Sequence, residues 1–236
     1  MGKELINKFL FVGNRAEDYF INNKEKLSNI INDMVSTNND KYELNIFQDT
    51  ISIREIEVQH ILVIDSDDCL LEDKIKLFKD LNIFIVIDIG MDKLDIIERY
   101  FSNESIIKVS EINESLDWII LGVSNICKPI LGIGDMSYEK SNKELLGYRK
   151  YKYKKIDRVA SSIKELESDI MEVTKLEKSK TIVLIVFFHY QKFLDIQCEA
   201  SDLEYELGND KEFICFKVGH DNIDNQDNIQ LLLMWS

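Results

Sequence analysis

The sequence predicts an α/β protein in which a doubly wound, largely parallel sheet is followed by a mixed sheet with flanking helices. In the first half, apolar runs of strand length alternate with amphipathic stretches of helix length, as in βαβ units. The second half closes with three apolar runs and one helical stretch among them, which favours a mixed sheet. One proline and nine glycines in 236 residues indicate regular elements rather than low-complexity linkers.

The first half is expected to form a compact layer of strands and helices. We predict buried strands at 8–13, 42–47, 60–64 and 82–90, and helices at 14–34, 71–81 and 91–101. Asn14 can cap the first of these helices, because its side-chain oxygen can accept a hydrogen bond from an unpaired backbone N–H of the first turn. The apolar residues of that helix fall on one face, which would pack against the sheet.

The second half begins after a step that must interrupt any helix, Lys128-Pro129, because proline lacks a backbone N–H and restricts the residue before it. We expect two domains, 1–127 and 128–236. In the second domain we predict helices at 154–173 and 200–207, and strands at 181–190, 212–221 and 229–236. An Asn/Asp-rich turn separates the last two strands, so they are expected to pair as an antiparallel hairpin.

Composition excludes several classes of function. The chain has a net charge of −14, from 29 Lys and Arg against 43 Asp and Glu, which opposes attraction to nucleic acid and to anionic membranes. The amino terminus lacks the apolar stretch of a signal peptide, and no run reaches the roughly 18 apolar residues that a membrane span needs. We therefore expect a cytoplasmic protein with no membrane span and no nucleic-acid partner.

Cysteine and histidine do not indicate a metal site. The four cysteines are widely spaced and form no CxxC pair, which favours reduced thiols over zinc ligands or disulfides. Only three histidines are present, too few to suggest a His-based centre. No metal ion or other cofactor is expected.

An acidic turn in the stretch ILVIDSDDCLLEDK, residues 61–74, has two competing interpretations. Between an apolar run and the start of a helix it carries Asp65, Asp67 and Asp68. Acids at the carboxyl end of a strand can hold Mg²⁺ and accept a phosphoryl group, with Asp88 as a further carboxylate, which predicts a Mg-dependent phospho-acceptor or hydrolase. Alternatively, one of residues 66–68 caps the helix that begins near Leu70 and favours its positive end, which requires no ligand.

A family resemblance rests on the order of several pieces in the second half. The pieces are LGIGD (131–135), DRVASSIKELES (157–168), KTIVLIVFFHYQKFLDIQCEASDL (180–203) and EFICFKVGHDNIDNQDNIQLLLMWS (212–236). In order and spacing they resemble the carboxyl-terminal half of FtsZ, the bacterial relative of tubulin. The resemblance implies an FtsZ C-terminal-like domain preceded by a shortened GTPase-like domain, and with it a cytoskeletal role connected with cell division.

The nucleotide positions of the family can be compared with this chain one by one. Where the family has a strand and then Gly-Gly-Gly-Gly-Asn, this chain has Val12-Gly13-Asn14-Arg15, with a single glycine. Where the family has the phosphate loop Gly-Gly-Gly-Thr-Gly-Thr-Gly, residues 65–69 read Asp-Ser-Asp-Asp-Cys. Glycine loops let backbone N–H groups surround phosphates, whereas carboxylates repel them. The resemblance therefore implies that the acidic turn replaces a phosphate site.

A second position leads to the same expectation. The family's synergy loop, Asp-Phe-Ala-Asp, sends its second aspartate into the nucleotide pocket of the next subunit, and the matching residues here are Asp117-Trp118-Ile119-Ile120. Isoleucine cannot polarise a water molecule. The chain is thus expected to be a pseudo-GTPase, without enzymatic activity.

Two segments are candidates for contact with a protein partner. The first is an apolar segment that consists of Trp118, Ile119, Ile120 and Leu121. If it is exposed, it marks an interface; otherwise it is a buried helical turn. The second interleaves tyrosines with cations, and its candidates are Tyr148, Arg149, Lys150, Lys152, Lys154 and Lys155. These residues would suit an acidic protein surface, or they form the solvated face of a strand or hairpin. We expect a structural or regulatory protein that associates with an FtsZ-family filament or with itself.

Overall fold

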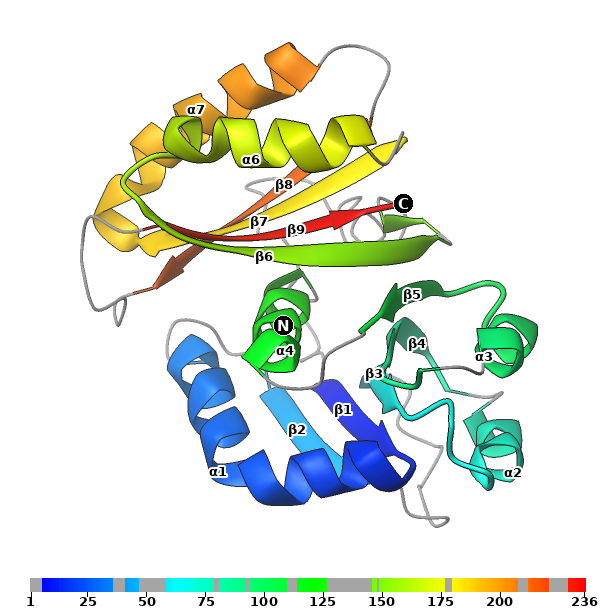
Figure 1. The fold of residues 1–236 in the computed structure, drawn as a ribbon. Helices are drawn as coiled ribbons and strands as arrows, with labels where there is room; N and C mark the ends of the chain where they lie inside the picture. The colour runs from blue at the N-terminus through cyan, green and yellow to red at the C-terminus, as the bar shows by residue number, and fades with distance from the viewer. Residues whose placement is uncertain are drawn as a thin grey trace. The chain divides into compact units, whose positions relative to one another are not determined.

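A computed structural model describes most of the chain. The described residues are 6–35, 41–46, 58–78, 81–91, 94–109, 114–126, 146–147, 149–176, 180–207, 212–220 and 229–236. They belong to two compact units, residues 1–150 and 151–236, each with its own set of strands and helices (Figure 1). The expected domain boundary, between 127 and 128, and the LGIGD piece fall at 127–145, which lies outside the described residues.

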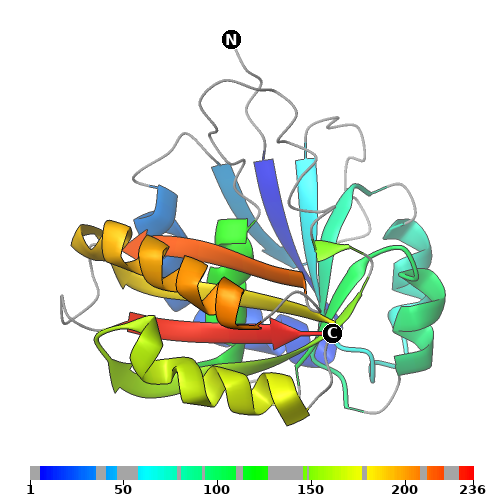
Figure 2. The same cartoon turned by 90° about the horizontal axis from the view of Figure 1, so that it is seen from above.

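The sheet of unit 1 contains parallel strands in the order β2-β1-β3-β4-β5, side by side in Figure 2. Their bounds are β1 Ile6–Val12, β2 Lys41–Ile46, β3 Val58–Ile64, β4 Ile83–Asp88 and β5 Ser105–Lys108. The largely parallel layer predicted from the alternating pattern is confirmed. Only β5 was not anticipated, because its four residues are too short to stand out as an apolar run.

Helices cover both faces of this sheet. Their bounds are α1 Asn14–Val35, α2 Leu71–Ile75, the 3₁₀ turn η1 Lys76–Phe78, α3 Leu94–Tyr100 and α4 Glu114–Ile126. Successive residues of a strand point to opposite faces. Leu10 packs into a core that includes residues of α2 and α3, whereas Phe11 stacks on Phe20 of α1 with 4.9 Å between ring centroids. The layer is therefore doubly wound.

The sheet of unit 2 is mixed, with the strand order β6-β9-β7-β8. Its elements are β6 Lys150–Ala160, α6 Ile163–Leu176, β7 Thr181–His189, the 3₁₀ turn η3 Tyr190–Lys192, α7 Phe193–Leu207, β8 Glu212–His220 and β9 Ile229–Trp235. Apolar residues of both helices join one core with alternate residues of the strands, so α6 and α7 cover the same face (Figure 1).

The predicted hairpin between the last two strands is wrong. β8 pairs parallel with β7 on one side, and β9 pairs antiparallel with β7 on the other. The first eight residues of β7 are all buried, so this strand takes a central position with neighbours on both edges. The α7 crossover returns the chain parallel to β7 along one edge, and β9 fills the other.

The predicted helix at 154–173 is also partly wrong. Residues up to Ala160 belong to β6, and the helix begins only at Ile163. Glu165 donates its backbone N–H to the hydroxyl of Ser162 at 3.3 Å, and the N–H of Ser161 donates to the carboxylate of Glu165 at 3.2 Å. This Ser-x-x-Glu capping arrangement is the sequence signal that marks the true helix start.

Candidate functional site

The candidate site lies at the carboxyl edge of the unit 1 sheet. Because the strands are parallel, the residues that follow β1, β3, β4 and β5 meet at one edge. The chain direction across the sheet reverses between β1 and β3, and open α/β sheets bind ligands outside such a reversal. Gly13 follows β1 and the acidic turn 65–68 follows β3, so both lie at this point.

Gly13 brings the end of β1 close to the acidic turn. Its φ is +94°, and a Cβ there would lie 3.0 Å from Cβ of Asp65 and 3.2 Å from Cβ of Asp68. A larger residue would be strained and crowded at the same time. The backbone N–H of Gly13 donates to a carboxylate oxygen of Glu17 at 3.2 Å, one turn into α1.

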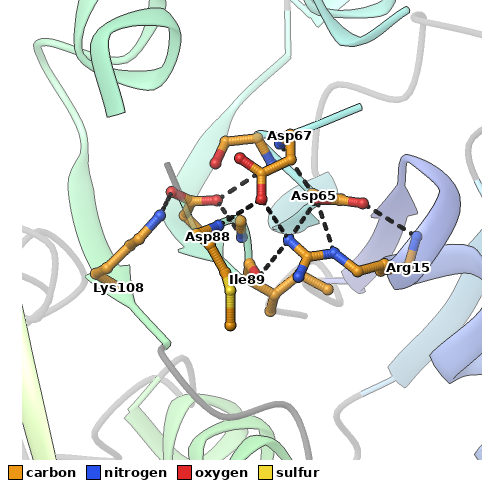
Figure 3. Close-up of polar contacts among 9 residues, drawn as sticks. Arg15, Asp65, Asp67, Asp88, Ile89 and Lys108 are labelled. Atoms are coloured by element: carbon orange, nitrogen blue, oxygen red, sulfur yellow. Dashed lines mark hydrogen bonds and ion pairs between the residues drawn. The ribbon is translucent and has the colours of Figure 1, made fainter. Parts of the chain in front are cut away.

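Arg15, in the first turn of α1, forms a tight ion pair with Asp65 (Figure 3). Nη2 and Nε of Arg15 lie 2.8 and 3.2 Å from Oδ1 of Asp65, and the backbone N–H donates to Oδ2 at 3.1 Å. Burial by itself raises the pKa of Asp65, but the hydrogen bonds and charge of Arg15 outweigh it, and the pKa lies below its usual range. Asp65 is therefore an anion held by its own cation.

The guanidinium of Arg15 also joins the turns after β3 and β4. Its Nη2 lies 2.8 Å from Oδ2 of Asp67 and 3.0 Å from the carbonyl oxygen of Ile89. The same oxygen of Asp67 accepts the backbone N–H of Met91 at 2.6 Å. One side chain thus fixes three strand ends relative to one another.

Asp88 is the buried centre of a second group of contacts. It is 0 % exposed, and Oδ1 accepts the backbone N–H groups of Ser66 at 3.3 Å and Gly90 at 2.9 Å. Nζ of Lys108, at the end of β5, lies 2.7 Å from Oδ2 (Figure 3). Both oxygens are therefore occupied.

Asp68 fulfils the predicted capping role only in part. Its Oδ1 accepts the backbone N–H of Leu70 at 3.0 Å, one residue before α2, and no side chain caps the first turn itself. Lys74 lies 3.7 Å from Oδ2 of Asp68 and 3.0 Å from Glu17. The turn is thus stabilised from within the protein.

The contacts of the acidic turn do not favour the alternative in which these carboxylates bind Mg²⁺. Among the residues that the structure describes, no set of three or more His, Cys, Asp or Glu side chains has the geometry to hold a metal ion. The carboxylates of the turn are directed instead at cations and backbone N–H groups of the chain. A phospho-acceptor would need an accessible oxygen, and Asp88 is enclosed.

The segment matched to the synergy loop lies in α4. Asp117 is 8 % exposed and accepts hydrogen bonds from the hydroxyl of Tyr19 and from Nζ of Lys26, both on α1. Burial and this bond to Asp117 raise the pKa of Tyr19. Of the four apolar candidates, Ile119 and Ile120 are 0 % exposed. Trp118 and Leu121 are partly exposed.

The basic candidates lie along the start of β6. Lys150, Lys152 and Lys154 alternate with the inward-facing Tyr151, which is 1 % exposed, and the three lysines are exposed. The remaining candidates, Arg149 and Lys155, are half-buried, and Tyr148 lies outside the described residues. Lys150 forms an ion pair with Glu98 of α3.

Sequence reasoning missed the cations of the site. Arg15, Lys74 and Lys108 come from three different elements, and none was assigned a role. A usable signal existed for Arg15, which lies two residues after the apolar run 8–13 and so falls at the carboxyl edge. The partners of these cations depend on which strands are neighbours, which the sequence does not show.

Comparison with known proteins identifies the fold. An FtsZ W319Y mutant from M. jannaschii is similar over 99 % of this chain and 91 % of its own, with a TM-score of 0.60 and 9 % identity. An FtsZ dimer from M. jannaschii, described as empty, has a TM-score of 0.60 and 9 % identity over 99 % and 88 %. No protein-family model and no curated protein matches the sequence. The chain has an FtsZ/tubulin-like fold, which confirms the resemblance.

Among the described residues, no helix is long and apolar enough to cross a membrane.

Proposed function

We propose that this chain is a non-catalytic relative of FtsZ that has kept the fold, has lost GTP binding and acts by associating with a filament-forming relative or with further copies of itself. The proposal joins the fold with the chemistry at the carboxyl edge of unit 1. A fold can be kept while its functional site is lost. The proposal about activity therefore rests on the residues at the carboxyl edge and not on the fold.

The observation that carries the proposal concerns backbone N–H groups at the strand ends. In a phosphate-binding loop such groups point at the ligand. Here they donate to carboxylates of the chain itself: Gly13 to Glu17, Arg15 and Asp67 to Asp65, Ser66 and Gly90 to Asp88, and Met91 to Asp67. These six backbone N–H groups are therefore already paired within the chain.

Charge reinforces this argument. Five carboxylates, those of Glu17, Asp65, Asp67, Asp68 and Asp88, surround three cations in these contacts. Near a protein surface, two like charges about 4 Å apart repel by about 4 kcal/mol. A triphosphate at this edge would meet an excess of negative charge, and the cations would have to leave their present partners to bind it.

The test is isothermal calorimetry of the purified chain with GTP, with and without Mg²⁺. We expect no saturable binding up to millimolar GTP. A GTP-binding FtsZ measured in the same buffer is the positive control. A dissociation constant in the micromolar range for this chain would refute the loss of GTP binding.

Association is tested separately by light scattering. We expect the same assembly state with GTP, with GDP and with neither, because the proposed contacts do not involve nucleotide. On the apolar segment, replacing the partly exposed Trp118 with alanine should weaken association, while Leu77→Ala, at an exposed apolar residue of η1, should not. A strict monomer that leaves the polymerisation of a filament-forming FtsZ unchanged would contradict the association role.

A further inference from the structure

The two helices of unit 2 leave a groove between them. Helices α6 and α7 cover the same face of the sheet (Figure 1). The hollow between them measures about 170 Å³. Its polar lining consists of Lys164, Glu167, Glu199, Asp202, Tyr205 and Glu206. Two buried apolar residues, Ile163 and Leu203, complete the lining. The α6–α7 groove, defined by these residues, thus combines an apolar base with charged walls.

The charge of the groove is strongly negative. The fifteen residues of α7 include five carboxylates and no lysine or arginine, and Lys164 is the single cation of the groove lining. Glu167 on α6 lies near enough to Glu206 on α7 to raise the pKa of the Glu206 carboxyl, with Asp202 adding to the effect and Lys164 opposing it. Both carboxyls line the groove, so a cationic side chain placed between them would reduce their mutual repulsion.

An exposed stripe on α7 adjoins the groove. Residues spaced by four, three and four positions are all exposed, namely Leu194, Cys198, Ser201 and Tyr205. Leu194 is 75 % exposed and Tyr205 is 89 % exposed, which is high for large apolar side chains. The core residues Ile196, Ala200 and Leu203 lie two positions away from members of the stripe and occupy the opposite face. The spacing is that of a helix surface that packs against another helix.

We propose that the α6–α7 groove and this stripe form the docking surface for a basic amphipathic helix of a partner protein. Lysine or arginine side chains of the partner would enter among the carboxylates, and its apolar face would cover Leu194 and Tyr205. Helix-in-groove recognition places apolar anchors of the ligand at helical spacing on an apolar strip. An acidic wall beside the strip would add attraction and specificity for the partner's cations. The proposal deepens the association role proposed above, on which it rests, by assigning a surface and a partner chemistry to it.

A second copy of this chain is a weaker occupant for the groove. Two α7 helices packed against each other would bring ten carboxylates together without a cation of their own, which is repulsive at neutral pH. The most lysine-rich segment among the described residues, 150–155, lies on strand β6 and not on a helix, and the lysines of α1, Lys24 and Lys26, are accompanied by Asp18 and Glu25. Charge complementarity therefore selects a cationic helix from another protein.

The test uses a synthetic helical peptide of leucine and lysine, about 18 residues long, with the leucines at helical spacing and a fluorescent label. Fluorescence anisotropy with the full chain should show saturable binding. The double variant Asp202→Asn/Glu206→Gln should weaken binding about tenfold, and Tyr205→Ala should weaken it about fivefold. The matched control, Asp18→Asn/Glu25→Gln, removes the same charge from exposed positions of α1 and should change binding less than about twofold.

Each other outcome would overturn the proposal. A control pair that weakens binding as much as the groove pair would show general attraction to an acidic protein. The same conclusion would follow if a peptide of equal composition with scrambled leucines bound equally well. Sedimentation of the wild-type chain as a dimer that Tyr205→Ala dissociates would assign the surface to a second copy. None of these readouts involves GTP or Trp118, so failure here is distinguishable from failure of the proposed function.

Discussion

Replacement of Arg15 by methionine is the most direct test of the ion-pair network at the carboxyl edge. Methionine keeps apolar length and removes the charge and the donors. Asp65, which is 2 % exposed, would then keep only its bonds from the backbone N–H groups of residues 15 and 67. The link from Arg15 to Asp67 and to the carbonyl of Ile89 would be lost as well.

The size of the effect follows from burial. Removing one partner of a buried ion pair costs about 3–5 kcal/mol, because the other charge remains buried without its partner. The side chain of Arg15 is 33 % exposed, so solvent screens part of the interaction, and about 2–3 kcal/mol is expected at pH 7. Lys76→Met is the control: its ion pair with Asp73 is exposed, so solvent screens it and its loss should have little effect on stability.

The pH dependence provides a second, independent readout. In the native protein the pKa of Asp65 is lowered, so this carboxylate contributes stability above its unfolded pKa of about 4, and the contribution is lost as pH falls through the lower folded value. Without Arg15, burial dominates and the pKa of Asp65 should rise above the unfolded value. The buried anion then destabilises the variant at neutral pH, and protonation removes that penalty. The stability gap should be largest near pH 7 and close on acidification.

The assay is urea unfolding followed by tryptophan fluorescence in a Trp235→Phe background. In that background the signal comes from Trp118 of α4 and therefore reports on unit 1. An equal cost for Arg15→Met and Lys76→Met, or a gap that stays constant between pH 7 and 4, would refute the reasoning from the buried ion pair.

Three further predictions concern other positions. Gly90→Ala should lower the free energy of unfolding by about 2–3 kcal/mol in urea titrations, because an added Cβ would lie 1.8 Å from Oγ of Ser66; a loss below about 0.5 kcal/mol would contradict this. Ser162→Ala should cost about 1 kcal/mol by removing the cap of α6, and Ser162→Thr should retain most of it; equal losses in both variants would argue against the cap. Millimolar Mg²⁺ should leave the fluorescence of Trp118 and Trp235 unchanged, since the acidic turn is bonded internally; a saturable change would revive the Mg-dependent alternative.

The strands of the layer were predictable because burial on both faces makes them continuous apolar runs. The run at 82–90 became β4, Ile83–Asp88, and the run at 181–190 became β7. Pairing was less predictable, because it depends on which run is most completely buried and on where the crossover helix lands. The wrong hairpin shows this limit: an Asn/Asp-rich turn permits local pairing but does not prevent β7 from lying between β8 and β9.

The candidate site was predictable in position but not in chemistry. Acids after an apolar run must lie at a carboxyl edge if the sheet is parallel, and the acidic turn does. The partner of Asp65 is Arg15, which is 50 residues away in the sequence, and the partner of Asp88 is Lys108, which ends a strand that was not predicted. Contacts between residues so far apart in the sequence can be predicted only once the strand order is known.

If phosphate binding has been lost as proposed, the internal hydrogen bonds at the carboxyl edge would make that loss hard to reverse. In a phosphate loop, the backbone N–H groups point at an external anion, which can bind and dissociate. Here the carboxylates that accept hydrogen bonds from the backbone N–H groups belong to the chain itself. The fold therefore fixes their effective concentration at the carboxyl edge, whatever anions the solution contains. Neutralising Asp67 alone would leave Arg15 paired with Asp65, and the N–H groups of Ser66 and Gly90 bonded to Asp88. The contacts proposed to exclude an anion also join the ends of β1, β3 and β4, so selection for stability alone would retain them.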